Sequence, residues 1–424
     1  MSRSTRLRPR FALIAAYLFV QTGSAWAQTT FWLEDNFDVV AKAKASRKAT
    51  VADERDGPGW PVEVRRIRYD QLNFRGYSST ADLADPDQKW VGAYQLYRFA
   101  GDYRLVEVGT RNMAGELNGL SVSFDRDGEL SYETPYVNGV MQGMGRHYVG
   151  GELRDLTPLV DGKREGFETS YYDGRIRKLT ELHNNKIDGV VEQYGSLHSP
   201  QVLTQRSHYH DGRLDGWERV WSLEGALLQE THYVDGRKNG IQRNWLNQAA
   251  GQLASVYHYD DDQLRGLQQY YSGGRLDEER VLGDDGQRLR RTQFWPIDGS
   301  PRKAEDRLET DAQGRRRRVD ETFSNTGHLI TRHISFRDAP HYIKTHYSED
   351  GQVVYRKEVV DGKPSGLQIE QTFDGQYEWR RYDDQGRLHG EQADYRNGQP
   401  VRQWTMSHGE PVGDRQDSGS DSAG

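Results

Sequence analysis

Three histidines at matching positions of a repeated pattern are the first residues whose spacing suggests chemistry. His208, His232 and His258 each stand directly before a tyrosine, about one repeat apart. A metal site would need their imidazole nitrogens to converge at about 2.1 Å from one ion. If each repeat adds two β-strands, successive histidines lie roughly 10 Å apart and do not converge. We therefore interpret them as surface histidines beside packed tyrosines, and we predict no metal and no cofactor.

Basic residues recur just after a turn position, where an unopposed stripe would suit phosphate head groups or acidic glycans. They are Lys163, Lys186, Arg213, Arg237, Arg275, Lys363 and Arg387. Aspartates precede several of them by two residues, at Asp161, Asp211, Asp235 and Asp361. Because neighbouring acids cancel the field of a basic column, we interpret this column as self-neutralised turn chemistry. Contact with membrane lipid stays open as a weaker alternative.

The usual catalytic signatures are absent from the sequence. It has no Gly-x-Ser-x-Gly elbow, no His-Glu-x-x-His motif, no phosphate-binding loop and no dinucleotide fingerprint. Carboxylate pairs occur throughout a chain with 64 acids, so they single out no acid–base pair. We predict that the protein is not an enzyme. A carbohydrate-binding or carbohydrate-active protein is the least favoured alternative.

The elements that position these residues form an internal repeat of about 24 residues, clearest over 209–245. A first glycine follows aspartate, at Gly212 and Gly236, and Asp-Gly is a strong signal for a two-residue hairpin turn. A second glycine opens a strand and recurs at Gly119, Gly143, Gly166, Gly189, Gly216, Gly240, Gly266, Gly366 and Gly390. The residue after it is apolar in eight of the nine copies, Glu391 being the exception. A second turn, such as 223–225, should then reverse the chain into the next strand.

An aromatic residue follows the second glycine by five positions in eight of the nine copies. This aromatic column comprises Phe124, Tyr148, Tyr171, Tyr194, Trp221, Trp245, Tyr271 and Tyr395. One interpretation is a core in which rings stack from hairpin to hairpin, at about 0.5–1.5 kcal/mol per ring pair beyond burial. The other is a sugar- or peptide-binding platform on an open sheet face. We expect the core arrangement, because a one-layer sheet needs that burial to hold together.

The pattern predicts an all-β fold: an elongated antiparallel β-meander, a solenoid-like ribbon of stacked hairpin repeats. The chain contains no cysteine, so its stability must come from repeat packing rather than disulfides. Its formal charge is −7, and without the four arginines of residues 1–27 it becomes −11. So acidic a chain is a poor polyanion binder, which argues against nucleic acid as a partner.

The first 27 residues have the order of a secretory signal peptide. Arginines precede the apolar run 11–20, and Ala25-Trp26-Ala27 offers a small-x-small cleavage site. We expect export to the periplasm or the extracellular space after cleavage near Ala27, with no transmembrane segment remaining.

Six segments should follow this leader. They are a non-repeat segment over 28–60 with a short helix around 36–46, degenerate leading repeats over 61–111, regular repeats over 112–281, degenerate repeats over 282–355, regular repeats over 356–412 and a disordered tail over 413–424.

The recurring order of aromatic, two residues, Gly-Lys/Arg-x-x-Gly, an apolar residue and Tyr/Trp resembles the MORN repeat, especially the bacterial variant of YwqK-type antitoxin proteins. The resemblance covers roughly 112–274 and 356–408. Pieces such as FDRDGEL and YDDQGRL are also similar to the YD repeats of Rhs-type toxins. The resemblance implies stacked hairpins and a protein-binding or scaffolding role in the cell envelope. The alternative that it implies is an antitoxin or immunity protein that neutralises a toxin.

Overall fold

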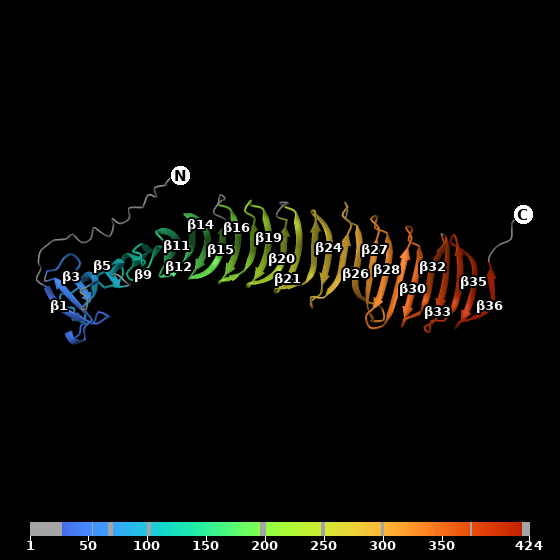
Figure 1. Ribbon diagram of the computed structural model, residues 1–424, viewed down its shortest axis with the longest axis horizontal. Coiled ribbons are helices and arrows are strands. Elements are labelled where there is room, and N and C mark those ends of the chain that lie inside the picture. The colour runs from blue at the N-terminus through green and yellow to red at the C-terminus, as the bar shows by residue number, and fades with distance from the viewer. Residues whose placement is uncertain are drawn as a thin grey trace. The chain divides into compact units, whose positions relative to one another are not determined.

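The computed structural model describes residues 28–52, 54–66, 71–99, 103–195, 201–246, 251–297, 301–373 and 375–417. These residues form 36 strands, and the only helical element among them is the three-residue 3-10 turn η2, Lys42–Lys44. Strands that follow each other along the chain pair antiparallel as hairpins (Figure 1). The described ladder is not closed, because β1 pairs only with β2 and β36 only with β35. The predicted fold class, an all-β antiparallel meander of hairpins, is confirmed.

Two compact units make up the chain. The first ends at Leu214 and also includes Leu223–Gly225, and the second comprises Asp215–Ser222 and continues from Ala226. The strands of the first unit are β1 Gln28–Leu33, β2 Arg47–Ala52, β3 Trp60–Arg66, β4 Gln71–Ser78, β5 Trp90–Phe99, β6 Tyr103–Arg111, β7 Gly119–Phe124, β8 Leu130–Val137, β9 Val140–Met141, β10 Gly143–Val149, β11 Glu152–Val160, β12 Lys163–Arg164, β13 Gly166–Tyr172, β14 Arg175–His183, β15 Lys186–Tyr194, β16 Leu203–His210 and β17 Arg213–Leu214.

The second unit continues the same alternation of strands and turns. Its strands are β18 Gly216–Trp221, β19 Leu227–Val234, β20 Arg237–Trp245, β21 Leu253–Asp260, β22 Gln263–Leu264, β23 Gly266–Ser272, β24 Arg275–Leu282, β25 Arg288–Phe294, β26 Arg302–Thr310, β27 Arg316–Phe323, β28 Leu329–Phe336, β29 His341–Tyr347, β30 Val353–Val360, β31 Lys363–Pro364, β32 Gly366–Phe373, β33 Gln376–Tyr382, β34 Gly390–Arg396, β35 Gln399–Ser407 and β36 Glu410–Asp417.

Two kinds of turn alternate along the hairpins. At Asp235-Gly236 both central residues have positive φ, 50° and 83°, as a type I′ hairpin turn requires. The second kind is an Asp-x-x-Gly turn. In the copy that starts at Asp383, the backbone N–H groups of Gln385 and Arg387 donate to one aspartate oxygen. Such side-chain bonds to nearby backbone explain why Asp and Ser start these turns.

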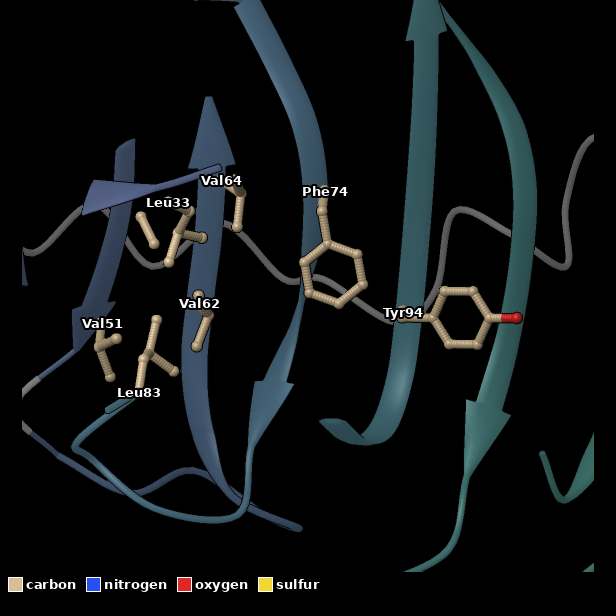
Figure 2. Close-up of a cluster of buried hydrophobic side chains, with 8 residues drawn as sticks. Leu33, Val51, Val62, Val64, Phe74, Leu83 and Tyr94 are labelled. Carbon is tan, nitrogen blue, oxygen red and sulfur yellow. The ribbon is translucent and has the colours of Figure 1, made fainter. Parts of the chain in front are cut away.

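A cluster of buried apolar side chains lies at the N-terminal end of the first unit (Figure 2). Its members include Leu33, Val51, Val62, Val64, Phe74, Leu83 and Tyr94. The segment 28–60, for which we expected a short helix around 36–46, therefore supplies strands to a core. Phe37 takes a φ of 75°, and the N–H of Val40 donates to the carbonyl of Trp32. The chain thus folds back as a turn, and only η2 is helical.

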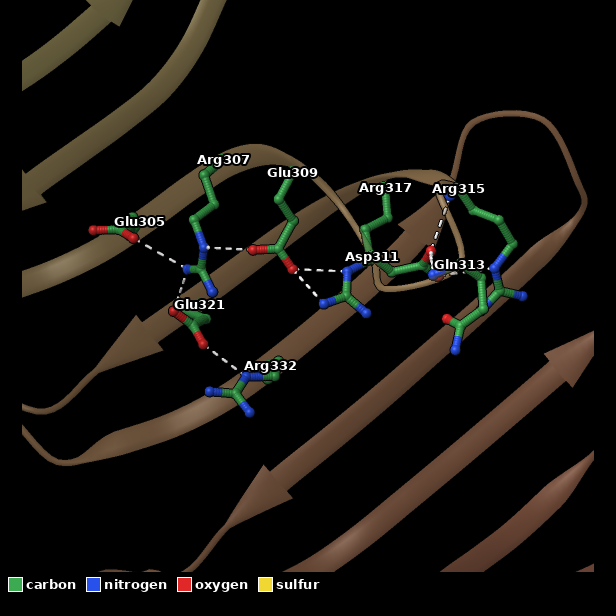
Figure 3. Close-up of polar contacts among 9 residues, drawn as sticks. All are labelled: Glu305, Arg307, Glu309, Asp311, Gln313, Arg315, Arg317, Glu321 and Arg332. Atoms are coloured by element: carbon green, nitrogen blue, oxygen red, sulfur yellow. Dashed lines mark hydrogen bonds and ion pairs between the residues drawn. The ribbon is translucent and has the colours of Figure 1, made fainter.

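Ion pairs hold together strands of the region 282–355, where the repeat weakens. Arg307 and Arg332 each place a nitrogen 2.6 Å from the carboxylate of Glu321, whose side chain is only 6% exposed (Figure 3). Arg307 also bonds Glu309, which Arg317 contacts in turn. Burial raises the pKa of Glu321, but the hydrogen bonds and charges of the two arginines outweigh it and leave the pKa below its usual range. This region is regular β-structure held by charge pairs.

The two ends of the chain lie largely outside the described residues. The predicted signal peptide, 1–27, falls entirely there, as does 418–424. The tail that we expected to be disordered from residue 413 differs in its first part, because β36 continues through it to Asp417. Pairing with β35 explains the difference, since that strand supplies backbone partners that composition does not reveal.

Candidate functional site

The turn glycines occupy two fixed positions of the hairpin. Gly212 and Gly236 lie in type I′ turns with φ of 84° and 83°. The nine second-position glycines all have positive φ, between 62° and 114°. Each faces a large apolar residue on the next long strand: Tyr136, Leu159, Leu182, Tyr209, Tyr233, Tyr259, Leu282, Tyr382 or Met406. The glycines therefore shape the backbone and offer no ligand-binding group.

A glutamine amide fills the irregular pairing beside several of these glycines. Gln268 is 1% exposed, and its Oε1 accepts the backbone N–H of His258 at 3.1 Å. Its Nε2 donates to the carbonyls of His258 and Arg265. Gln368 and Gln392 make the same three kinds of bond two residues after their own glycines. The sequence analysis missed this structural feature, although Gly-x-Gln recurs in four repeats.

The aromatic column lies where the strand register shifts. A register shift directly precedes each of its eight members, and each stands opposite an aliphatic residue or a proline, as Trp221 does opposite Leu227. All eight are half-buried. Among the described ring pairs, none joins two members of the column. The expected ring-on-ring stack is thus replaced by aromatic–aliphatic pairs, because column members stand two strands apart, about 10 Å.

The polar partners of these aromatics are structural. The hydroxyl of Tyr194 donates to Glu192, whose other oxygen binds Arg206. Burial, together with the charge and hydrogen bond of Glu192, raises the pKa of Tyr194 to about 12. A phenol with that pKa stays protonated at neutral pH and serves as a hydrogen-bond donor, not as a base.

The histidine column makes local contacts. Nδ1 of His232 donates to the carbonyl of Asn239 at 2.9 Å, and its ring meets Trp217 edge-on at 5.0 Å. No group of three or more His, Asp or Glu side chains within the described ranges is arranged to hold a metal ion.

Several of the basic residues that follow the turns reach forward to the next turn along the chain, whereas Arg387 pairs with Asp383 of its own turn. Lys186 Nζ lies 2.8 Å from the Asp211 carboxylate, and Arg237 pairs with Asp261 in the same way. Lys163 donates to Asn184. We expected the aspartate of the same turn to neutralise each base, but the contacts of Lys186, Arg237 and Lys163 link successive turns.

One sheet face of β7–β13 is apolar and exposed. Its exposed members, which we call the apolar face, are Leu120, Val137, Val140, Met144, Val160 and Phe167, each 41–52% exposed. Cross-strand pairs place them on one side: Leu120 faces Pro135, Met144 faces Pro158, and Val137 faces Val140. The Glu133–Arg146 and Leu156–Thr169 pairs continue this side across the neighbouring strands.

The opposite face of the same strands is mixed: it carries small and polar residues at the centre of the strands and aromatic or aliphatic residues such as Tyr132 and Val149 nearer their ends. Ser121 pairs with Thr134, and Gly145 pairs with Thr157.

The members of the apolar face lie on neighbouring strands, and this contiguity distinguishes it from scattered surface hydrophobics. Three of its members, Val137, Val140 and Val160, were not singled out from the sequence. The other three follow a turn glycine, and that position predicts a strand but not whether another layer covers it.

Comparisons with known proteins give no family for this chain. No family model matches it, and no curated protein matches it. Solved structures with some likeness include TcdB2-TccC3, at 10% identity over 91% of this chain, and the Photorhabdus luminescens Tc holotoxin pore, at 12% over 92%, both with a TM-score of 0.17. A eukaryotic initiation factor follows at 10% identity and a TM-score of 0.14, covering 92% of this chain and 90% of its own.

The chain spans 21% and 24% of the two toxin chains, and TM-scores this low do not indicate a shared fold. Among the described residues, no helix is long and apolar enough to cross a membrane.

Proposed function

We propose that this protein is a non-enzymatic protein-binding module of the cell envelope, exported after cleavage near Ala27. The observation that carries the proposal is the apolar face of β7–β13, where six large apolar side chains remain 41–52% exposed on one side of the sheet. Burying such surface stabilises a complex by about 25 cal/mol per Å² before the costs of association. The arginine-led segment and the Ala-x-Ala order of residues 1–27 support export.

The test is capture of envelope proteins by the mature chain compared with two matched double variants. Met144→Gln with Phe167→Gln makes the apolar face polar. Val149→Gln with Tyr172→Gln makes the same kind of change five residues further along the same two strands, on the opposite side. Val149 and Tyr172 are as exposed as their counterparts, 49% and 48%.

We expect a captured protein to be lost with the first variant and kept with the second. Circular dichroism and thermal melts of both variants report whether they fold like the wild type. Equal capture by all three proteins would refute a binding role for the apolar face.

A further inference from the structure

We infer that the partner segment seated on the apolar face is cationic and amphipathic. This inference rests on the proposed function, since it names the chemistry of the partner at the same surface. Three features support it: the length of the row of apolar residues across the strands, the net charge of the hairpins that carry this row, and the polar partners of the nearby basic residues.

The apolar row has the length of a short peptide. Leu120, Pro135, Met144, Pro158 and Phe167 lie on β7, β8, β10, β11 and β13, which are consecutive partners in the ladder. At about 4.8 Å between strands, the row extends roughly 19 Å. A helix of about 13 residues has that length, since each residue adds about 1.5 Å.

The hairpins that carry the row are strongly acidic. Residues 112–172 contain ten Asp and Glu against five Lys and Arg, a net charge of −5. Asp125, Asp127 and Glu129 lie in the turn between β7 and β8, at one end of the strands. At the other end, Asp161 in the turn after β11 and Glu165 between β12 and β13 are balanced by Lys163 and Arg164. The acidic excess next to the apolar face therefore lies at the end of the strands that holds the β7–β8 turn.

Four of the five basic residues of this segment have polar partners, among them Arg154 with Glu152. Arg146 pairs with Glu133, and Arg164 lies 3.6 Å from Glu168. Lys163 donates to Asn184. The remaining field is negative, so it attracts cations and repels anionic lipid head groups. An apolar face alone would suit a membrane as well as a peptide, and the charge around it favours a basic polypeptide.

The experiment uses two synthetic 14-residue amphipathic peptides with identical leucine faces. One carries lysine on its polar face and the other glutamate. Binding to the full mature chain is measured by fluorescence anisotropy at low and high salt, alongside flotation with phosphatidylglycerol vesicles. We expect the lysine peptide to bind about tenfold more tightly at low salt, with the preference shrinking as salt screens the charges.

Three variants separate the contributions. Asp127→Asn with Glu129→Gln should weaken binding of the lysine peptide and, by removing repulsion, strengthen binding of the glutamate peptide, so the preference for lysine shrinks. The Met144→Gln, Phe167→Gln variant should weaken both peptides, while the opposite-face control should weaken neither.

The outcomes distinguish this inference from the function on which it rests. No preference for lysine, a preference for glutamate, or vesicle binding that needs the apolar face would each overturn the cationic partner. If the apolar-face variant still loses a captured envelope protein in any of these cases, the protein-binding function stands. If that variant changes neither capture nor peptide binding, both proposals fail.

Discussion

Gln268→Glu tests how a side-chain amide stabilises the break in strand pairing beside a second-position glycine. The substitution keeps the shape of the side chain and its acceptor for the His258 N–H at 3.1 Å. It removes the Nε2 donor that serves the carbonyls of His258 and Arg265 at 3.3 and 2.8 Å. An ionised carboxylate would then face two carbonyl oxygens at a position that is 1% exposed in the wild type.

The expected loss follows from the groups left without donors. A buried polar group without its partner costs about 1–3 kcal/mol, and more when a charge is involved. Two such carbonyls beside a carboxylate give an expected destabilisation of about 3 kcal/mol. Gln263→Glu is the matched control, because Gln263 is exposed and lies on the same hairpin. Exposed substitutions usually change stability by less than about 0.5 kcal/mol.

The assay is urea unfolding with site-resolved hydrogen exchange, since repeat arrays unfold locally. The loss should also depend on pH. Burial raises the pKa of the introduced carboxyl above its unfolded value of about 4.3. The charge-dependent part of the destabilisation therefore grows as pH rises from about 4.3 through that raised pKa, and it is absent below about 4.3. A variant as stable as wild type at pH 7, or a loss that is the same at pH 4 and pH 7, would refute the role of the amide.

Three further predictions concern the packing and the charges. In a double-mutant cycle on the free energy of unfolding, Trp221→Ala and Leu227→Ala should couple by about 0.5–3 kcal/mol, because the two residues are cross-strand neighbours. In a second cycle, the losses from Trp221→Ala and Trp245→Ala should add. Coupling between the two tryptophans, with none between Trp221 and Leu227, would support a stack of rings instead. Gly240→Val should cost about 1–3 kcal/mol because its φ is 98°, as thermal melts would measure, and an unchanged melt would contradict this. The folded pKa of Glu321 lies below the usual 4.5, so its ion pairs stabilise the fold fully above about pH 4.5 and lose that effect as pH falls through the folded pKa. The difference in melting temperature between wild type and Glu321→Gln should therefore shrink from pH 7 to pH 3. A difference that stays constant with pH would argue against the ion pairs.

The fold could be predicted from the sequence because its signals are local. Asp235-Gly236 specifies a two-residue turn by its own dihedral preferences, and the 24-residue period carries that turn from repeat to repeat. Strand order then follows, since short turns leave each strand only its chain neighbours to pair with. The segment around Phe37 was predicted less well, because its apolar residues pack against strands far along the chain.

The candidate site could be predicted only in part. The apolar residue after each glycine is visible in the sequence, at Met144 and Phe167 for example, but its exposure depends on whether another layer covers the sheet. The position of Trp221 in its column was correct, yet its neighbour was not. The sequence period relates equivalent residues of successive repeats, but one strand lies between those residues in the sheet. Trp221 therefore contacts Leu227 on that intervening strand and not the next member of its column.

The residue two positions after the second glycine differs from repeat to repeat. Where it is Gln268 or Gln368, the side-chain amide accepts a hydrogen bond from a backbone N–H of the neighbouring strand and so bridges the break in strand pairing. The preceding residues, Leu267 and Leu367, are half-buried. In the repeats of the apolar face this position holds Ser121, Gly145 or Glu168, which make no such bridge among the described contacts, and the residue before it is 41–52% exposed. Since a β-bulge re-aims the side chains beside it, the same glycine can serve either a tied strand or an open face. This position alone does not set the exposure, because Trp217 is half-buried before Glu218 whereas Phe167 is 52% exposed before Glu168. Repeats of one backbone pattern thus carry different surfaces according to the side chains on the neighbouring strands as well as this one.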